Sequence, residues 1–236
     1  MITGGPSVGE QFSGLKLDHL LFIGSNRVAK KVAAQAAKNL VPTTLELGGK
    51  SPTIIGTNAN MALAAERILF SKTLNAGQIC LSPDYIFVKK DQERNLISEL
   101  QKAYSKFFPE PNSHNQTSMV NKHHLKRMNS YLLDATKKGA IVESLGKNDD
   151  LDKNMISTKI VTEVNDSMDV MKHEIFGPVL PIMTYDSISD VVDYINKNDN
   201  PLGLYYFGRS QSEQNFVINN TRSCLLYTSP SPRDGW

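Results

Sequence analysis

The 236-residue sequence is short of cysteine, of net charge and of long apolar runs. Its two cysteines, Cys80 and Cys224, are too few for a disulfide framework or a structural metal site, so we expect no bound metal. A formal net charge of +2 is too small to indicate nucleic acid or an anionic membrane as a partner. The apolar run from Leu20 to Ile23 falls far below the roughly 18 residues of a membrane-spanning helix, so no span is predicted.

The amino-terminal segment, Met-Ile-Thr-Gly-Gly, lacks the charged and apolar stretches of a secretory signal. Together with the scarcity of cysteine, this predicts a cytoplasmic protein with reduced thiols. A composition of 40% hydrophobic and 21% charged residues is ordinary for a globular protein of one or two domains.

Strand and helix patterns alternate from the beginning of the chain. The sequence predicts a buried strand over residues 17–23, a helix over 27–40 and a second strand over 43–47. Residues 2–6 are interpreted as the end of an earlier strand. A strand–helix–strand unit of about thirty residues is the building block of parallel sheets, so we expect these strands to run in parallel.

The remainder of the chain continues this alternation. Further strands are predicted over residues 52–55, 85–88, 141–145, 156–164, 179–185 and 203–207. Helices are predicted over about residues 60–73, 91–107, 122–138 and 188–196, the first of them capped by Asn60. Strands that alternate with helices throughout indicate an α/β fold.

Two reactive side chains stand 34 residues apart, Glu46 at the end of a predicted strand and Cys80 at the end of a glycine-containing loop. A helix between them is long enough to bring them together. A thiolate beside a carboxylate that activates water suits acyl transfer through a thioester. From the residues alone, a cysteine such as Cys80 is more often a small buried hydrophobe, and a glutamate at a strand end such as Glu46 is usually solvated.

Three segments resemble motifs of the aldehyde dehydrogenase superfamily. Residues 45–52, Leu-Glu-Leu-Gly-Gly-Lys-Ser-Pro, are similar to its glutamate motif, and residues 75–80, Asn-Ala-Gly-Gln-Ile-Cys, resemble its cysteine motif at the same spacing. A third match is Glu-Ile-Phe-Gly-Pro at residues 174–178. Three motifs in family order are far more specific than any one, and the resemblance extends over about residues 1–223.

Several shorter segments resemble one branch of that superfamily, class 3 with its coniferyl-aldehyde dehydrogenase relatives. They are Asp-His-Leu-Leu-Phe at 18–22, Pro-Asp-Tyr at 83–85 and Pro-Val-Leu-Pro at 178–181. The resemblance implies hydrophobic or aromatic aldehydes as substrates and a homodimeric parent protein.

The resemblance also implies a mechanism. Cys80 would attack the aldehyde carbonyl to give a thiohemiacetal, with the oxyanion held partly by the Cys80 backbone N–H. Hydride would pass to NAD or NADP and leave a thioester, and Glu46 would activate the water that hydrolyses it. Lys50 is interpreted as a surface lysine or a member of a local ion pair, with no role in this chemistry.

Cofactor contacts are implied at the first predicted helix. Gly24, Ser25 and Val28 align with the family's nucleotide turn, Gly-Ser-Thr-x-x-Gly, at the place where a doubly wound sheet binds phosphate. Asn26 and Ala29 depart from that pattern, and the Ala29 methyl would crowd the approach of helix to ligand. One glycine and a capping residue occur at many helix starts, so the turn alone is a weak signal.

The third motif implies contacts at the other end of the cofactor. By resemblance, Glu174 would hydrogen-bond the nicotinamide ribose and Phe176 would pack beside the nicotinamide ring. A turn glutamate and a core phenylalanine are the alternatives.

The resemblance divides the chain into the end of a Rossmann-type nucleotide-binding domain, residues 1–47, and an incomplete α/β catalytic domain, residues 48–223. It implies an internal fragment, truncated at both ends, which we expect to be inactive alone. Residues 224–236 leave the family pattern and show no helix or strand pattern, so we interpret them as a non-native tail that does not fold. A cofactor-independent thiol esterase and a poorly folded, non-enzymatic fragment are the alternative functions.

Overall fold

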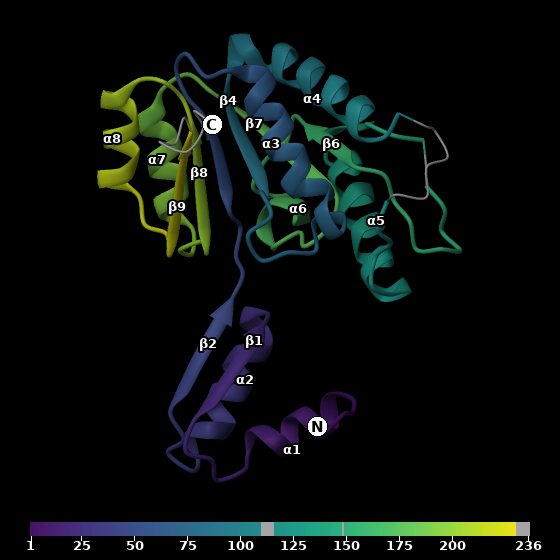
Figure 1. Ribbon diagram of the computed structural model, residues 1–236, viewed down its shortest axis with the longest axis vertical. Coiled ribbons are helices and arrows are strands. Elements are labelled where there is room, and N and C mark those ends of the chain that lie inside the picture. Colours follow the sequence, from purple (N-terminus) through teal and green to yellow (C-terminus); the bar gives the residue numbers. More distant parts are fainter. Residues whose placement is uncertain (110–115, 148, 230–236) are drawn as a thin grey trace. The chain divides into compact units, whose positions relative to one another are not determined.

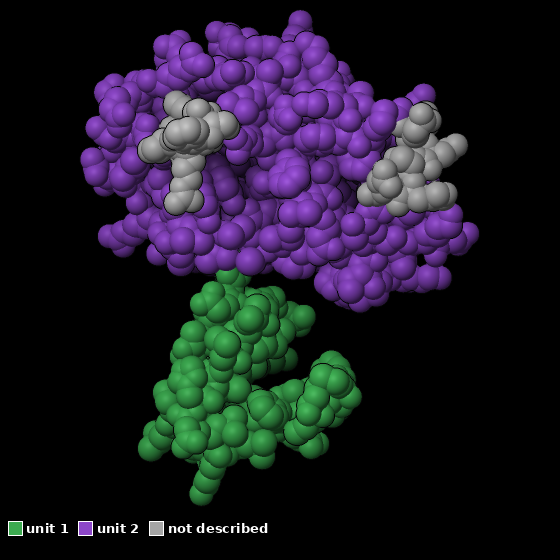
Figure 2. All heavy atoms as spheres, viewed as in Figure 1, with its two compact units in different colours: residues 1–48 green, residues 49–236 purple. Residues whose placement is uncertain are grey.

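Parallel β-strands form the framework of both parts of the chain in the computed structural model, which describes residues 1–109, 116–147 and 149–229. The chain divides into two units, residues 1–48 and 49–236 (Figure 2). No helix among the described residues is long and apolar enough to cross a membrane.

Unit 1 is a small strand–helix–strand unit preceded by a helix. Its elements are α1 (Pro6–Ser13), β1 (Leu20–Gly24), α2 (Asn26–Ala37) and β2 (Thr43–Leu47). The two strands pair in parallel, with Leu20 opposite Thr43 and Gly24 opposite Leu47, as predicted. Leu20 packs with Ala36 and Val41 in a core of its own.

Two expectations for unit 1 are wrong. Residues 2–6 form no strand. Helix α1 begins at Pro6 instead, because proline at the first helical position has a suitable φ and needs no hydrogen bond from its nitrogen. Strand β1 is not buried: Leu21 is 58% and Ile23 73% exposed. Successive side chains point to opposite faces of a strand. Leu20 points to the face that packs against Ala36 of α2, whereas Leu21 and Ile23 lie on the other face.

Unit 2 is built on a seven-stranded sheet with the order β5-β6-β7-β4-β3-β8-β9. Its strands are β3 (Pro52–Ile55), β4 (Tyr85–Lys89), β5 (Ile141–Ser144), β6 (Lys159–Thr162), β7 (Val179–Tyr185), β8 (Gly203–Phe207) and β9 (Leu225–Ser229). All neighbouring strands pair in parallel except β5 and β6, which are antiparallel. The predicted α/β class is therefore confirmed.

Helices cover both faces of this sheet (Figure 1). They are α3 (Met61–Thr73), α4 (Glu93–Phe107), α5 (Lys122–Lys137), α6 (Asp169–Lys172), α7 (Ile188–Lys197) and α8 (Gln211–Asn220), with 3-10 turns η1 (Leu74–Gly77) and η2 (Lys90–Gln92). Side chains alternate along β4: Ile86 and Val88 pack in the core with α3 and α4, whereas Tyr85 and Phe87 pack in the core with α5 to α8. This three-layer arrangement fits strands that are apolar on both faces.

Some helices were predicted and others were not. Asn60 caps α3 as predicted, because its side chain accepts a hydrogen bond from the Leu63 N–H at 3.1 Å. Helices α6 and α8 lie where no helix is predicted. Val217 is the buried residue of α8, and one apolar contact leaves no helical period to read.

Residues 225–229 correct the prediction that nothing folds beyond Cys224. Strand β9 pairs in parallel with β8, from Leu225 opposite Gly203 to Ser229 opposite Phe207. Main-chain hydrogen bonds to a preformed strand order a five-residue segment whose own pattern is too short to predict one. Residues 230–236 of the predicted tail lie outside the described residues.

Candidate active site

Three sequence segments meet at one edge of the unit 2 sheet because each precedes a parallel strand. Residues 50–51 lead into β3, residues 80–84 into β4 and residues 174–178 into β7. These strands are parallel neighbours in the order β7-β4-β3, so their amino ends share an edge. The topology thus brings Cys80 to the same edge as Glu174 and Phe176. The site differs from the usual ligand crevice of open α/β sheets, which lies at the carboxyl ends of the strands.

The loop that carries Cys80 leaves α3 through a strained turn. Asn75, Ala76 and Gly77 have φ of 52°, 55° and 69°, in the left-handed region that non-glycine residues rarely adopt. The Cys80 side chain is exposed, which removes the buried-hydrophobe alternative. Across the described residues, the Cys80 N–H has no hydrogen-bond acceptor, so it is free to bind an oxyanion.

The Gln78 side chain holds this turn in place. Its Nε2 donates to the Asn75 carbonyl at 2.9 Å and to the Ser118 carbonyl at 3.2 Å, and its Oε1 accepts from the Val120 N–H at 2.9 Å. The amide therefore ties the turn to the segment that leads into α5. Because Gln78 is buried and fully bonded, its contribution to the conformation of the loop is structural.

Gly77 lies against the third motif. A Cβ placed on Gly77 would come within 2.5 Å of the Gly177 carbonyl oxygen, and the φ of Gly77 is unfavourable for other residues. Glycine is thus required both by conformation and by the close approach of two backbones. The Cys80 loop and the Glu-Ile-Phe-Gly-Pro segment are in direct contact.

A buried ion pair joins the same segments. Lys50 Nζ pairs with Asp84, and it also donates to the Val170 carbonyl at 2.9 Å and the His173 carbonyl at 3.2 Å. Asp84 in turn accepts a hydrogen bond from the Ile175 N–H at 2.9 Å. Of the two interpretations of Lys50, the structure shows the ion pair.

Glu174 is partly buried between charged groups. Burial raises the pKa of its carboxyl, and the Asp84 carboxylate adds to the rise. A hydrogen bond from the Gly49 N–H and the positive charges of Arg127 and Lys50 oppose it. The hydrogen bond and these charges restrain the carboxylate at the edge of the sheet.

Phe176 is not a core residue. Its side chain is 36% exposed, and its φ of 46° lies in the left-handed region. A large residue in that conformation costs free energy and needs support from its surroundings. The core-phenylalanine alternative is therefore wrong, and an exposed ring is available to pack against a ligand.

Two further residues near Cys80 were not predicted. Lys72 is fully buried on α3; its Nζ donates to the Pro83 carbonyl at 2.8 Å, and burial lowers its pKa to about 8. The Tyr205 hydroxyl donates to the Leu81 carbonyl at 2.5 Å, and burial raises its pKa to about 12. Lys72 carries a recognisable signal, since it falls on the apolar face of α3 at helical spacing from Ile68.

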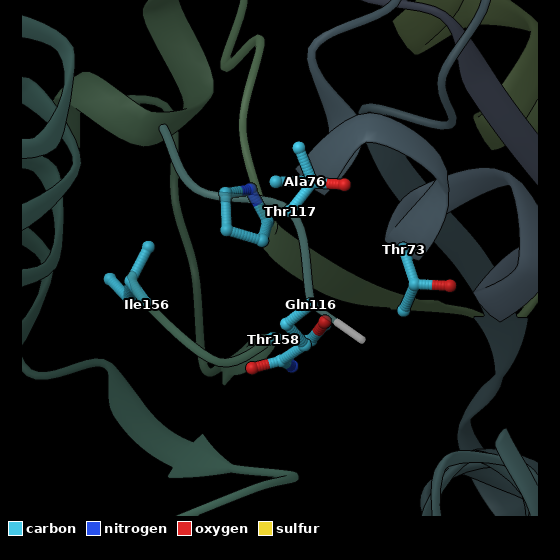
Figure 3. Close-up of a pocket in the computed structure, with 7 residues that line it drawn as sticks. Thr73, Ala76, Gln116, Thr117, Ile156 and Thr158 are labelled. Carbon is cyan, nitrogen blue, oxygen red and sulfur yellow. The ribbon is translucent and has the colours of Figure 1, made fainter. Parts of the chain in front are cut away.

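A cavity of about 10 Å³ is lined in part by Ala76 of this turn (Figure 3). It is lined by Thr73, Ala76, Gln116, Thr117, Ile156, Thr158 and Pro178. Gln116 Oε1 is buried and has no hydrogen-bond partner within the described part of the chain. The volume suits one water molecule, so this cavity is not a substrate site.

Unit 1 holds the predicted phosphate turn and Glu46. Gly24 ends β1, and Ser25 precedes α2 with extended backbone and no capping hydrogen bond from its side chain. Gly24, Ser25 and Val28 are exposed. The free hydroxyl and the amino terminus of a twelve-residue helix fit a phosphate group.

Ala29 and Glu46 complete the predicted residues of unit 1. Ala29 is buried, so its methyl is a packing group. Glu46 lies in β2 opposite Ile23, and its side chain is exposed. Within residues 1–109, 116–147 and 149–229, no cluster of three or more His, Cys, Asp or Glu side chains is placed to hold a metal ion.

Comparisons with known proteins identify the family and the fold. The chain is 44% identical over 228 residues to a probable coniferyl aldehyde dehydrogenase of Caulobacter vibrioides, covering 94% of this chain and 47% of that protein. The structure of AldH of Staphylococcus aureus in a substrate-bound state superposes with a TM-score of 0.91 at 34% identity, covering 99% of this chain and 50% of that one. The predicted fold and family resemblance are confirmed.

A third protein has a nucleotide bound. Betaine aldehyde dehydrogenase of Staphylococcus aureus, solved in complex with NAD+, has a TM-score of 0.86 at 25% identity and covers 96% of this chain and 47% of that one. The chain thus spans about half the length of the proteins it matches. Residues 1–229 match the model of the aldehyde dehydrogenase family, and the chain belongs to that family.

Proposed function

We propose that this chain carries the reactive thiol of an enzyme that oxidises an aldehyde to a carboxylic acid with NAD or NADP. The observation that carries the proposal is the position of Cys80. Its thiol is exposed at the end of a strained loop, and that loop contacts the Glu-Ile-Phe-Gly-Pro segment through Gly77. Family membership supports the reaction class.

In the first step, the Cys80 thiolate adds to the carbonyl carbon of the aldehyde. A C–S bond forms, and the π electrons of the carbonyl move to its oxygen. The free N–H of Cys80 donates to that oxyanion and stabilises the thiohemiacetal.

Oxidation needs a hydride acceptor. NAD or NADP, when bound, would supply the hydride acceptor, and loss of hydride from the thiohemiacetal carbon would leave a thioester on Cys80. The α2 amino terminus with Gly24, Ser25 and Val28 would hold the phosphates. Glu174 would hydrogen-bond the nicotinamide ribose, and the exposed ring of Phe176 would lie beside the nicotinamide. The NAD+ complex of the betaine aldehyde dehydrogenase supports this cofactor class.

Hydrolysis completes the reaction. Glu46, exposed in β2, would take a proton from water, whose oxygen adds to the thioester carbonyl. The C–S bond then breaks, the acid leaves and the Cys80 thiolate is restored. Glu46 belongs to unit 1 and Cys80 to unit 2, so its role rests on the motif in which it stands.

The substrate class that we propose is hydrophobic or aromatic aldehydes. The Caulobacter relative is named a probable coniferyl aldehyde dehydrogenase, which supports an aromatic aldehyde. We also propose a cytoplasmic, homodimeric parent protein, in keeping with the class 3 resemblance.

Thiol labelling tests the proposal, because both cysteines are exposed and one serves as the control. Iodoacetamide labelling of Cys80 is followed by peptide mass spectrometry across pH, with and without NAD+ and an aromatic aldehyde. We expect aldehyde and NAD+ to slow the labelling of Cys80 and to leave Cys224 unchanged. Labelling of the two thiols at one rate under all conditions would exclude Cys80 as the nucleophile.

The same samples distinguish the alternative functions. Turnover of an aromatic ester that does not depend on added nucleotide would identify a thiol esterase. A broad, non-cooperative thermal transition would identify a poorly folded fragment.

A further inference from the structure

One side chain on α5 binds the backbone of the third motif at three consecutive residues. Arg127 Nη1 donates to the Ile175 carbonyl at 2.7 Å and to the Glu174 carbonyl at 3.3 Å, and Nη2 donates to the Phe176 carbonyl at 3.3 Å. A guanidinium presents several donors in a rigid plane, which allows it to span adjacent carbonyls. This guanidinium is thus bonded to backbone along the whole candidate nicotinamide segment.

Arg127 is itself held in position. Its guanidinium lies over the ring of Tyr131 at 5.4 Å from the ring centre, one helical turn further along α5. Nη2 lies 3.4 Å from Nδ1 of His124, one turn earlier. Burial and the adjacent Arg127 lower the pKa of His124, so the ring remains neutral and can accept this hydrogen bond. The neighbours on α5 therefore limit the guanidinium to one orientation.

The opposite charge holds the same backbone from the sheet. Asp84 Oδ1 accepts from the Ile175 N–H at 2.9 Å, so both backbone polar groups of Ile175 are bonded to charged side chains. The Ile175 side chain is fully buried. Charge-assisted hydrogen bonds are the stronger ones, and two of them converge on this residue. Ile175 is thereby fixed between Glu174 and Phe176.

The conformation that these bonds hold is unfavourable by itself. Phe176 has a left-handed φ of 46°, which costs a large residue free energy. The interaction of its carbonyl with Arg127 offsets that cost. Without Arg127, the segment would lose three carbonyl contacts, and Phe176 would be free to return to an ordinary φ.

We propose that Arg127 is a positioning residue for the nicotinamide end of the cofactor. It bonds to the backbone of residues 174–176 and through it sets the places of the Glu174 carboxylate and the Phe176 ring. The inference rests on the function proposed above, since it assumes that these two side chains contact a nicotinamide nucleotide.

Substitutions at position 127 test this role. Arg127→Met removes all donors and keeps the apolar stem, whereas Arg127→Lys keeps the charge and cannot span three carbonyls. Lys126→Met is the matched control, because Lys126 is exposed, lies next to Arg127 on α5 and makes no hydrogen bond or ion pair with other described residues. Thermal unfolding of each variant shows whether the chain is folded.

The experiment is hydrogen exchange of the backbone amides of residues 174–177 in this chain, titrated with NAD+. Without nucleotide, we expect the Ile175 amide of Arg127→Met to exchange about tenfold faster. The bond from this amide to Asp84 remains, but the segment opens more easily once the charged hydrogen bonds from Arg127 to its carbonyls are lost. We also expect the NAD+ concentration that gives half-maximal protection to rise about tenfold. Arg127→Lys should lie between, and Lys126→Met should match the wild type.

Each result decides a different point. Exchange at Ile175 that is unchanged in Arg127→Met would overturn the inference, and so would faster exchange with an unchanged NAD+ dependence. If NAD+ fails to protect even the wild-type chain at these residues, the cofactor assignment in the proposed function fails and takes the inference with it. If NAD+ protects the wild-type chain and the Arg127→Met chain equally well, the positioning role of Arg127 is wrong while the cofactor assignment stands.

Discussion

The backbone N–H of Ile175 donates a hydrogen bond to Asp84 over 2.9 Å, although 91 residues separate the two in sequence. Asp84 follows Cys80 in the loop before β4, and Ile175 lies between Glu174 and Phe176 before β7. The bond therefore connects the thiol loop to the candidate cofactor segment. Lys50 adds a third segment through its ion pair with Asp84. The relative positions of the reactive groups in unit 2 depend on this buried carboxylate.

Asp84→Asn should lower the free energy of unfolding by about 3 kcal/mol, because it leaves the Lys50 charge without its partner in a buried place. The side chains of the pair are 17% and 4% exposed. Urea unfolding measures the loss. The control is Glu66→Gln, which breaks the exposed ion pair between Glu66 and Lys106 and should cost less than about 1 kcal/mol. Equal losses of unfolding free energy in the two variants would show that the buried pair stabilises the protein no more than the exposed pair does.

Lys72 predicts an unusual dependence of stability on pH. Its pKa of about 8 lies below the value of 10.5 for a free lysine, so the unfolded chain binds more protons between these values. Stability should therefore rise with pH in this window, and the full penalty is present below pH 8. We expect the wild type to gain about 2 kcal/mol relative to Lys72→Met between pH 8 and pH 10.

Unfolding of the two proteins in urea at several pH values measures this gain. The comparison with Lys72→Met cancels the tyrosines, whose raised pKa values make stability fall at still higher pH in both proteins. A constant difference between the two proteins from pH 8 to pH 10 would mean that Lys72 keeps its proton throughout.

Gly77 and Gly139 separate the effect of conformation from that of contact. Both have positive φ, 69° and 97°, but a Cβ on Gly139 would meet nothing within 4 Å, whereas one on Gly77 would lie 2.5 Å from the Gly177 oxygen. Gly139→Ala should cost about 1 kcal/mol of unfolding free energy for its conformation. Gly77→Ala should cost about 2 kcal/mol more, because a backbone carbonyl must shift. Similar losses would show that the loop can move away from Gly177 without cost.

Much of the fold was predictable because its strands and long helices bury one face or two. The apolar runs at 52–55, 85–88, 179–185 and 203–207 coincide with β3, β4, β7 and β8, whose residues are largely buried. Helix α8 escaped prediction because it buries one apolar residue, and β9 because its order comes from the strand beside it. The hydrophobic pattern of a segment predicts its structure where the segment is buried. It does not predict structure that depends on pairing with a neighbouring strand.

The candidate site was predictable in its residue types and less so in its geometry. The motifs singled out Cys80, Glu174 and Phe176, and the structure brings these three to one edge. Arg127 lay outside any motif, since its partners are backbone carbonyls 47 to 49 residues away and a carbonyl has no sequence signature. Contacts of that kind depend on strand order, which periodicity does not reveal.

Strand β9 offers a test of whether residues beyond Cys224 belong to the folded protein. Leu226 is half-buried and packs against the core on the sheet face covered by α5 to α8. The preceding residue, Leu225, is 42% exposed. Because successive side chains point to opposite faces of a strand, the two leucines should respond differently to a charge. Leu226→Asp should lower the free energy of unfolding by about 2 kcal/mol, since a carboxylate there loses its water and finds an apolar core.

Leu225→Asp should change the free energy of unfolding by less than about 0.5 kcal/mol, as exposed substitutions generally do. Urea unfolding of the two variants and the wild type gives both values. If neither aspartate lowers the free energy of unfolding, the interpretation of these residues as an unfolded tail is restored, because an unfolded segment tolerates a charge at both positions. A large loss at Leu226 alone requires a strand with an inner and an outer face, which places residues 225–229 in the folded α/β unit together with the Cys80 site.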